Sequence, residues 1–141
     1  MKTFMSRAAL TGLLMGVSVL ASAATPAPKG AEVSIVSPED GATVPQTFVV
    51  KFAVENIALA PAGDTTKNTG HHHLLIDVDK LPAAGQAIPN DANHLHFGKA
   101  QTQAEVKLTP GKHTLQLELG DSGHMPFDPP IVSEKITVTV K

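Results

Sequence analysis

The segment FVVKFAVE, residues 48–55, decides the fold class of this chain. Every second residue of this segment is apolar and bulky: Phe48, Val50, Phe52 and Val54. A period of two is typical of a β-strand that buries one face in a core. Runs with the same alternation follow, and one precedes it: residues 33–35, 74–78, 94–97, 104–108, 113–119 and 131–140. The chain is therefore predicted to contain about seven short strands.

Turn-forming residues separate these runs, and no convincing helical period of 3.6 residues occurs after residue 24. The breaks fall at Pro45-Gln46, Pro61-Ala62-Gly63, Pro89-Asn90-Asp91 and Pro110-Gly111. Short strands at this spacing predict an all-β fold, an immunoglobulin-like antiparallel β-sandwich over residues 32–141. In such an order the strands are B (48–55), C (71–78), D or C′ (94–97), E (103–108), F (113–119) and G (131–140).

Composition excludes several classes of protein. The 141 residues carry a net charge of −2 and contain no Cys, Trp or Tyr. Without Cys there is no disulfide framework, iron–sulfur cluster, thiolate zinc site or Cys nucleophile. The near-neutral charge argues against a nucleic-acid partner.

Residues 1–23 have the features of a secretory signal peptide. Lys2 and Arg7 precede an apolar run over residues 8–20, and Ala21-Ser22-Ala23 fits a cleavage site. The run is too short for a membrane-spanning helix, which needs about 20 residues. We therefore expect a periplasmic or secreted protein without a membrane span after cleavage, beginning with a flexible leader at residues 24–31. Loss of Lys2 and of the single Arg would change the net charge from −2 to −4.

Six of the seven histidines fall in three motifs that are far apart in the sequence. They are GHHHLLID (70–77), NHLHFG (93–98) and GDSGHMP (120–126). Strand alternation predicts that His72 shares the core-facing side of Leu74, whereas His71 and His73 point to the opposite face. In an HxH strand segment the two imidazoles lie about 6–7 Å apart on one face.

The expected topology brings these motifs together. The loops before strand C, after strand D or C′ and after strand F gather at one end of such a sandwich. His113 begins strand F at the other end, so it is excluded from the predicted site.

Imidazole is the commonest transition-metal ligand in proteins, and nitrogen donors without thiolate suit Cu(II), Zn, Ni or non-haem Fe. The predicted metal ligands are His71, His73, His94, His96 and His124. Reserve candidates are His72, Met125 and Asp128, and Asp121, Asp128 and Asp77 are candidates to orient ligands or to add an oxygen ligand. Two other interpretations stay open: histidines that cap loop backbone, and histidines that act as a pH sensor.

The motifs GHHHLLID (70–77), HLHFGKAQTQAEVKL (94–108) and PGKHTLQLELGDSGHMPFDPP (110–130) resemble those of a family of small exported bacterial proteins, domain of unknown function 4399. The resemblance spans about residues 33–140. It implies a periplasmic or secreted β-domain and carries no known activity.

These observations lead to one functional hypothesis with two alternatives. The first is a non-catalytic copper- or zinc-binding domain for metal buffering, delivery or resistance, with the metal ion and another envelope protein as partners. The second is a metalloenzyme with a histidine-ligated site, either superoxide dismutase-like or hydrolytic. Against the dismutase stand the absence of a Cys pair and, after cleavage of residues 1–23, the absence of an Arg that would guide superoxide to the metal. The third is a cell-envelope structural or ligand-binding module with structural histidines.

Overall fold

The computed structural model describes residue 16 and residues 23–141, so the predicted signal peptide lies almost wholly outside the described residues. Within the described part the chain forms nine strands and no helix. The strands are β1 (Glu32–Ser37), β2 (Thr43–Val44), β3 (Thr47–Glu55), β4 (Ala58–Leu59), β5 (Thr69–Ile76), β6 (His94–Phe97), β7 (Gln103–Lys107), β8 (Gly111–Gly120) and β9 (Ile136–Val140). No helix in this part of the chain is long and apolar enough to cross a membrane.

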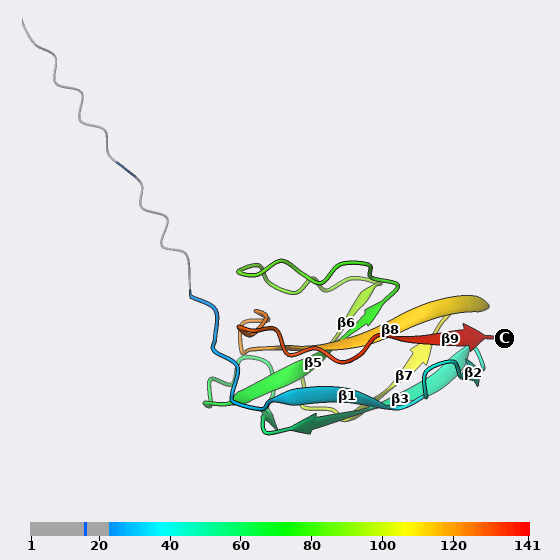
Figure 1. Cartoon of the computed structure of the whole chain (residues 1–141), viewed down its shortest axis with the longest axis horizontal. Coiled ribbons are helices and arrows are strands. Elements are labelled where there is room, and N and C mark those ends of the chain that lie inside the picture. Colours follow the sequence, from blue (N-terminus) through cyan, green and yellow to red (C-terminus); the bar gives the residue numbers. More distant parts are fainter. Residues whose placement is uncertain (1–15, 17–22) are drawn as a thin grey trace, which may run out of the picture.

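The strands form two layers (Figure 1). One sheet has the order β1-β3-β7. The other has the order β2-β9-β8-β5-β4, and β6 also pairs with β5. All the long pairs are antiparallel, whereas the two-residue strands β2 and β4 pair in parallel with β9 and β5.

This topology confirms the predicted immunoglobulin-like sandwich. The order β1-β3-β7 corresponds to strands A, B and E, and β9-β8-β5-β6 to strands G, F, C and C′. Because β6 pairs with β5 rather than with the other sheet, residues 94–97 form strand C′ and not strand D.

The last predicted strand is shorter than expected, since only Ile136–Val140 of residues 131–140 are a strand. The preceding residues still run beside β8: the Ser133 N–H donates to the Leu117 carbonyl oxygen over 2.9 Å. The Leu117 N–H, however, donates to Ser133 Oγ over 2.8 Å. The Ser133 hydroxyl thus takes the place of a backbone carbonyl as the acceptor. The regular hydrogen bonding between β8 and β9 therefore begins only after Ser133, at Ile136.

The core lies between the two sheets and follows the alternation seen in the sequence. In β3 the side chains of Phe48, Val50 and Phe52 are buried, whereas Val49 and Lys51 are exposed. Three leucines of β8 complete the opposite layer: Leu115, Leu117 and Leu119. Strand β5 differs because residues 70–76 are buried on both faces.

Residues 24–31, expected to form a flexible leader, are joined to the end of the sandwich that carries the loop after β8. The Ala27 N–H donates to the Asp128 carbonyl oxygen, and the Asp128 N–H donates to the Thr25 carbonyl oxygen, both over 2.9 Å. The Thr25 hydroxyl donates to Asp121 Oδ2 over 2.6 Å. Backbone and side-chain hydrogen bonds therefore hold this segment against residues 121–128.

Candidate metal centre

Four imidazoles from three separate chain segments meet at one end of the sandwich. They belong to His71, His73, His96 and His124, and one ring nitrogen from each lies within 4.8 Å of those of the other three. The structure thus brings together four of the five histidines that were predicted to bind a metal. No acidic side chain of the described residues belongs to the group.

The alternation of β5 accounts for the positions of its three histidines. His72 points into the core, where its ring centroid lies 4.8 Å from that of Phe52. His71 and His73 therefore point to the other face, where their ring centroids are 4.7 Å apart. His72, a reserve candidate, is on the wrong face of the strand to join the four-histidine group.

The pairing of β5 with β6 places His96 and excludes His94. His96 is the register partner of His73, so the two side chains lie side by side on one face. His94 shares that face but is paired with Leu75, two residues farther from the cluster. Its Nδ1 lies 2.8 Å from Asp91 Oδ1 instead. The expectation that both histidines of the HxH segment join the group is thus corrected by the register.

A tight turn after β8 supplies His124. Its backbone has a φ of 64°, in the left-handed region that non-glycine residues rarely adopt. Asp121 stabilises this turn, because its Oδ1 accepts hydrogen bonds from the N–H groups of Gly123 and Met125 over 2.9 and 3.0 Å. The predicted orienting role of Asp121 is thus exerted on the loop that carries His124.

One pair of ring nitrogens lies at nearly the separation that a four-coordinate metal site requires. His71 Nε2 and His124 Nδ1 are 3.1 Å apart. In a tetrahedron with metal–nitrogen bonds of 2.0–2.1 Å, neighbouring nitrogens are about 3.3 Å apart. The six pairs of ring centroids are 4.7–5.9 Å apart, and His71 meets the rings of His96 and His124 edge-on at 89° and 87°. The rings surround a common point rather than stacking.

Burial keeps three of these imidazoles neutral. His71 and His73 are each 1% exposed. Burial, reinforced by the neighbouring histidines, lowers the pKa of His71 to about 4 and that of His73 to about 3. Burial followed by the charge of His124 also lowers the pKa of His96. A neutral imidazole offers a free lone pair to a cation, so these three donors have the protonation state that metal binding requires.

Two of the cluster's nitrogens, His73 Nδ1 and His96 Nε2, are buried without a hydrogen-bond partner among the described residues. A buried polar atom without a partner is costly, and one explanation for such an atom is a bound ion. The residues present therefore fit a metal ion.

Glycines beside the cluster give the rings room. A Cβ at Gly98 would lie 2.4 Å from His96 Cε1, and one at Gly120 would lie 2.7 Å from His73 Cε1. Both distances are shorter than carbon contacts allow. Absence of a side chain at these two positions is thus a condition for the observed arrangement of the rings.

One side of the cluster opens into a cavity of about 190 Å³. The cavity is lined by His73, His96, His124, Ala87, Ile88 and Asn90. The loop between β5 and β6 supplies the last three, and the Ile88 N–H donates to the His124 carbonyl oxygen over 2.8 Å. This loop therefore covers the histidines without filling the space beside them.

Sequence reasoning missed Glu118, which is 0% exposed. Glu118 is the register partner of His73 on β8, so His73 lies between His96 and Glu118 in one cross-strand row. Neither carboxyl oxygen has a hydrogen-bond partner among the described residues, and burial raises the pKa of Glu118 to about 7. In the sequence Glu118 looks like an ordinary solvent-facing position. No sequence signal revealed its burial, because the register that places Glu118 beside His73 comes from the pairing of β5 with β8.

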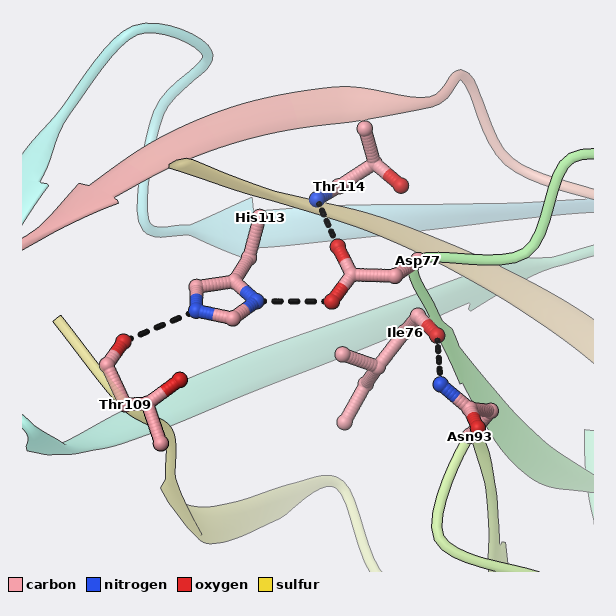
Figure 2. Close-up of polar contacts among 6 residues, drawn as sticks. All are labelled: Ile76, Asp77, Asn93, Thr109, His113 and Thr114. Carbon is pink, nitrogen blue, oxygen red and sulfur yellow. Dashed lines mark hydrogen bonds and ion pairs between the residues drawn. The ribbon is translucent and has the colours of Figure 1, made fainter. Parts of the chain in front are cut away.

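His113 lies in a separate polar network at the far end of β8 (Figure 2). Its Nε2 donates to the Thr109 carbonyl oxygen over 2.8 Å, and its Nδ1 lies 2.7 Å from Asp77 Oδ2. Asp77 Oδ1 accepts a hydrogen bond from the Thr114 N–H over 2.9 Å. The Asp77 hydrogen bond raises the pKa of His113. Asp77 therefore orients His113 and not the four-histidine group.

Two reserve candidates remain, Asp128 and Met125. Asp128 is exposed and outside the four-histidine group. Met125 is half-buried, and its backbone exchanges hydrogen bonds with Asp121. Its role as a sulfur ligand stays a prediction.

Comparisons with known proteins give a family but no activity. No curated protein matches the chain. The solved fibronectin(III)-like modules of Clostridium thermocellum CbhA match with 15% identity and a TM-score of 0.34, over 77% of this chain and 92% of theirs. The family model described as "Domain of unknown function (DUF4399)" matches residues 50–141, which contain all four clustered histidines. The chain belongs to the DUF4399 family, as its motifs indicated.

Proposed function

We propose that this protein is an exported, non-catalytic domain that binds one copper or zinc ion for metal buffering, delivery or resistance. The ligands would be His71, His73, His96 and His124. The observation that carries the proposal is the meeting of four ring nitrogens within 4.8 Å at one end of the sandwich. In delivery, the ion would be the cargo and another envelope protein its recipient.

The donor set supports the choice of metal. All four donors are imidazole nitrogens, which suit copper and zinc, whereas calcium and magnesium prefer oxygen ligands. Ligands from three chain segments hold the ion on a scaffold that the sandwich core already stabilises. Metal loading would therefore not require folding.

Strand β6 offers a matched pair of variants for the test. His96→Gln removes a proposed ligand, while His94→Gln removes a histidine on the same face that lies outside the group. Calorimetry with Zn(II) and Cu(II) on protein without a histidine tag should give a Kd below about 10 μM, roughly −7 kcal/mol. His96→Gln should weaken binding by at least about a hundredfold, more than the usual loss of an outer-shell partner. His94→Gln should change it by less than about threefold. Absence of binding tighter than 10 μM, or equal effects of the two variants, would reject the proposal.

Export has its own measurement. Mass spectrometry of protein from the periplasm or culture medium should find Ala24 as the first residue, as the Ala21-Ser22-Ala23 site predicts. Retention in the cytoplasm with residues 1–23 intact would contradict the export part of the proposal and leave the metal site untouched.

A second candidate function is a metalloenzyme, and the cavity beside three of the four imidazoles favours it. A catalytic metal needs access for a substrate, whereas a closed structural site does not. Superoxide, peroxide and ester assays on the metal-loaded protein separate the two candidates. Turnover that His96→Gln abolishes and His94→Gln preserves would support the enzyme, and inactivity in all three assays would favour the binding domain.

A further inference from the structure

The cavity at the four-histidine group is more than the gap left by ordinary packing. Its volume is about 190 Å³, and a water molecule in the liquid occupies about 30 Å³. It is lined by His73, His96 and His124 but not by His71. The cavity therefore lies beside three of the four proposed ligands.

The charge of a bound ion determines what this space would attract. Four neutral imidazoles would leave both positive charges of a divalent ion uncompensated in a largely buried site. Buried charge is costly unless an opposite charge lies close by. Glu118, next to His73 in the cross-strand row, and Asp121, whose charge acts on His71, can offset part of this charge, but neither belongs to the four-histidine group. An anion bound directly to the ion would offset its charge at shorter range.

The loop between β5 and β6 forms the other wall of the cavity and determines which chemical groups the cavity can bind. Ala87 and Ile88 give it an apolar surface, and the Asn90 amide adds a polar group that can donate a hydrogen bond. The hydrogen bond from the Ile88 N–H to His124 ties this wall to the cluster. The space is large enough for an anion of a few heavy atoms.

We propose that this cavity is a binding site for a small monodentate anion, which would bind the metal from the side of the cavity. The inference rests on the proposed metal-binding function. It adds that the centre has an exchangeable position, so that its occupant can be replaced without loss of the metal.

The test uses Cu(II)-loaded protein and azide as the probe anion. Azide should bind with a saturable change in the copper absorption and electron paramagnetic resonance spectra. Ala87→Phe places a large side chain at the cavity wall and should weaken azide binding at least tenfold. Its effect on Cu(II) affinity should be less than about threefold, because Ala87 is not a ligand.

Two further variants make the result decisive. Ala84→Phe makes the same substitution in the same loop outside the cavity lining, and azide binding should stay unchanged. Asn90→Phe obstructs the cavity from a different position and should repeat the effect of Ala87→Phe if that variant fails to fold. The inference is overturned if Cu(II) binds but azide has no effect, or if the cavity variants bind azide as the unaltered protein does. If Cu(II) itself does not bind, the proposed metal function fails and this inference fails with it.

Discussion

Glu118 places a carboxyl group inside the protein with neither oxygen hydrogen-bonded to the described residues. Its pKa is raised from 4.5 to about 7, so the folded protein holds a proton that the unfolded chain releases. Stability due to this group therefore falls as the pH rises from 4.5 to 7. In metal-free protein, Glu118→Gln should be close to neutral near pH 4.5 and stabilising by about 3 kcal/mol at pH 8.

Urea denaturation of both proteins at the two pH values measures this difference. Glu105→Gln, on the exposed face of β7, is the matched control and should give no such pH dependence. A gain from Glu118→Gln that is the same at pH 4.5 and pH 8 would show that Glu118 is not held protonated by burial.

The contribution of the His113–Asp77 pair to stability should also depend on pH. Because the pKa of His113 is raised, its stabilising contribution is complete below the unfolded value of 6.5 and is lost as the pH rises through the folded value. Asp77→Asn removes the negative charge but tolerates the left-handed backbone at this position, where φ is 56°.

We expect Asp77→Asn to lower the free energy of unfolding by about 1 kcal/mol at pH 5.5, since the network is partly exposed, and by less at pH 9. Denaturant titrations at both pH values measure it, with Asp79→Asn as the control on the neighbouring exposed position. A larger loss at pH 9 than at pH 5.5 would contradict the assigned role of the ion pair.

At the scale of elements, the short strand β6 matters because it holds His96 against β5. The strand ends at Phe97, and Gly98 lies so close to the His96 ring that any side chain would displace it. Gly98→Ala should therefore move the ring and weaken metal binding by about tenfold or more, the range seen when a ligand loses its orientation.

Gly123→Ala is the control for this variant. A Cβ at Gly123 would meet only Asp121 Oδ1 at 3.6 Å, which is ordinary van der Waals contact. Calorimetry with Zn(II) should show a clear loss for Gly98→Ala and little change for Gly123→Ala. Equal affinities for the two variants would indicate that the position of the His96 ring is not needed for binding.

The alternation of apolar residues was enough to predict the main strands, because burial of one strand face is a local property of the sequence. Strands β2 and β4 were not predicted, since two residues cannot show a period. The shortened β9 was not predicted either, because the interruption depends on Ser133 meeting the backbone of Leu117 on another strand. His94 was placed on the correct face, but only the register with β5 showed that it lies too far along the strand.

For the whole molecule, the meeting of remote histidine motifs was predictable because it follows from the strand order of the sandwich. The cavity was not, since it depends on how the long loop between β5 and β6 lies beside the histidines. The path of that loop is fixed by contacts between remote residues, such as the Ile88–His124 hydrogen bond. The burial of Glu118 was not predicted either.

The three adjacent histidines of β5 should make the metal-free protein sensitive to acid. Burial lowers the pKa values of His71 and His72 to about 4 and that of His73 to about 3. Between about pH 6.5 and pH 4 the unfolded chain therefore binds more protons than the folded protein, and stability rises with pH. The single opposing contribution of Glu118 is smaller than that of three histidines.

Urea denaturation in the presence of a chelator should show the free energy of unfolding falling by a few kcal/mol from pH 6.5 to pH 4.5. His72→Leu removes the core-facing imidazole without touching the four-histidine group, so it should reduce this slope. Stability that is constant or higher at pH 4.5 would contradict the burial of neutral imidazoles.

The four imidazoles are attached to an already folded sheet, and this has a calorimetric consequence. When a metal drives folding, apolar surface leaves water and the heat capacity of the system drops sharply. Here the buried core of the sandwich contains none of the four proposed ligands, so titrations with Zn(II) at several temperatures should give a nearly temperature-independent enthalpy of association. The ion would bind to a protein that is already folded, and the measured enthalpy should be that of ligand exchange at the metal alone.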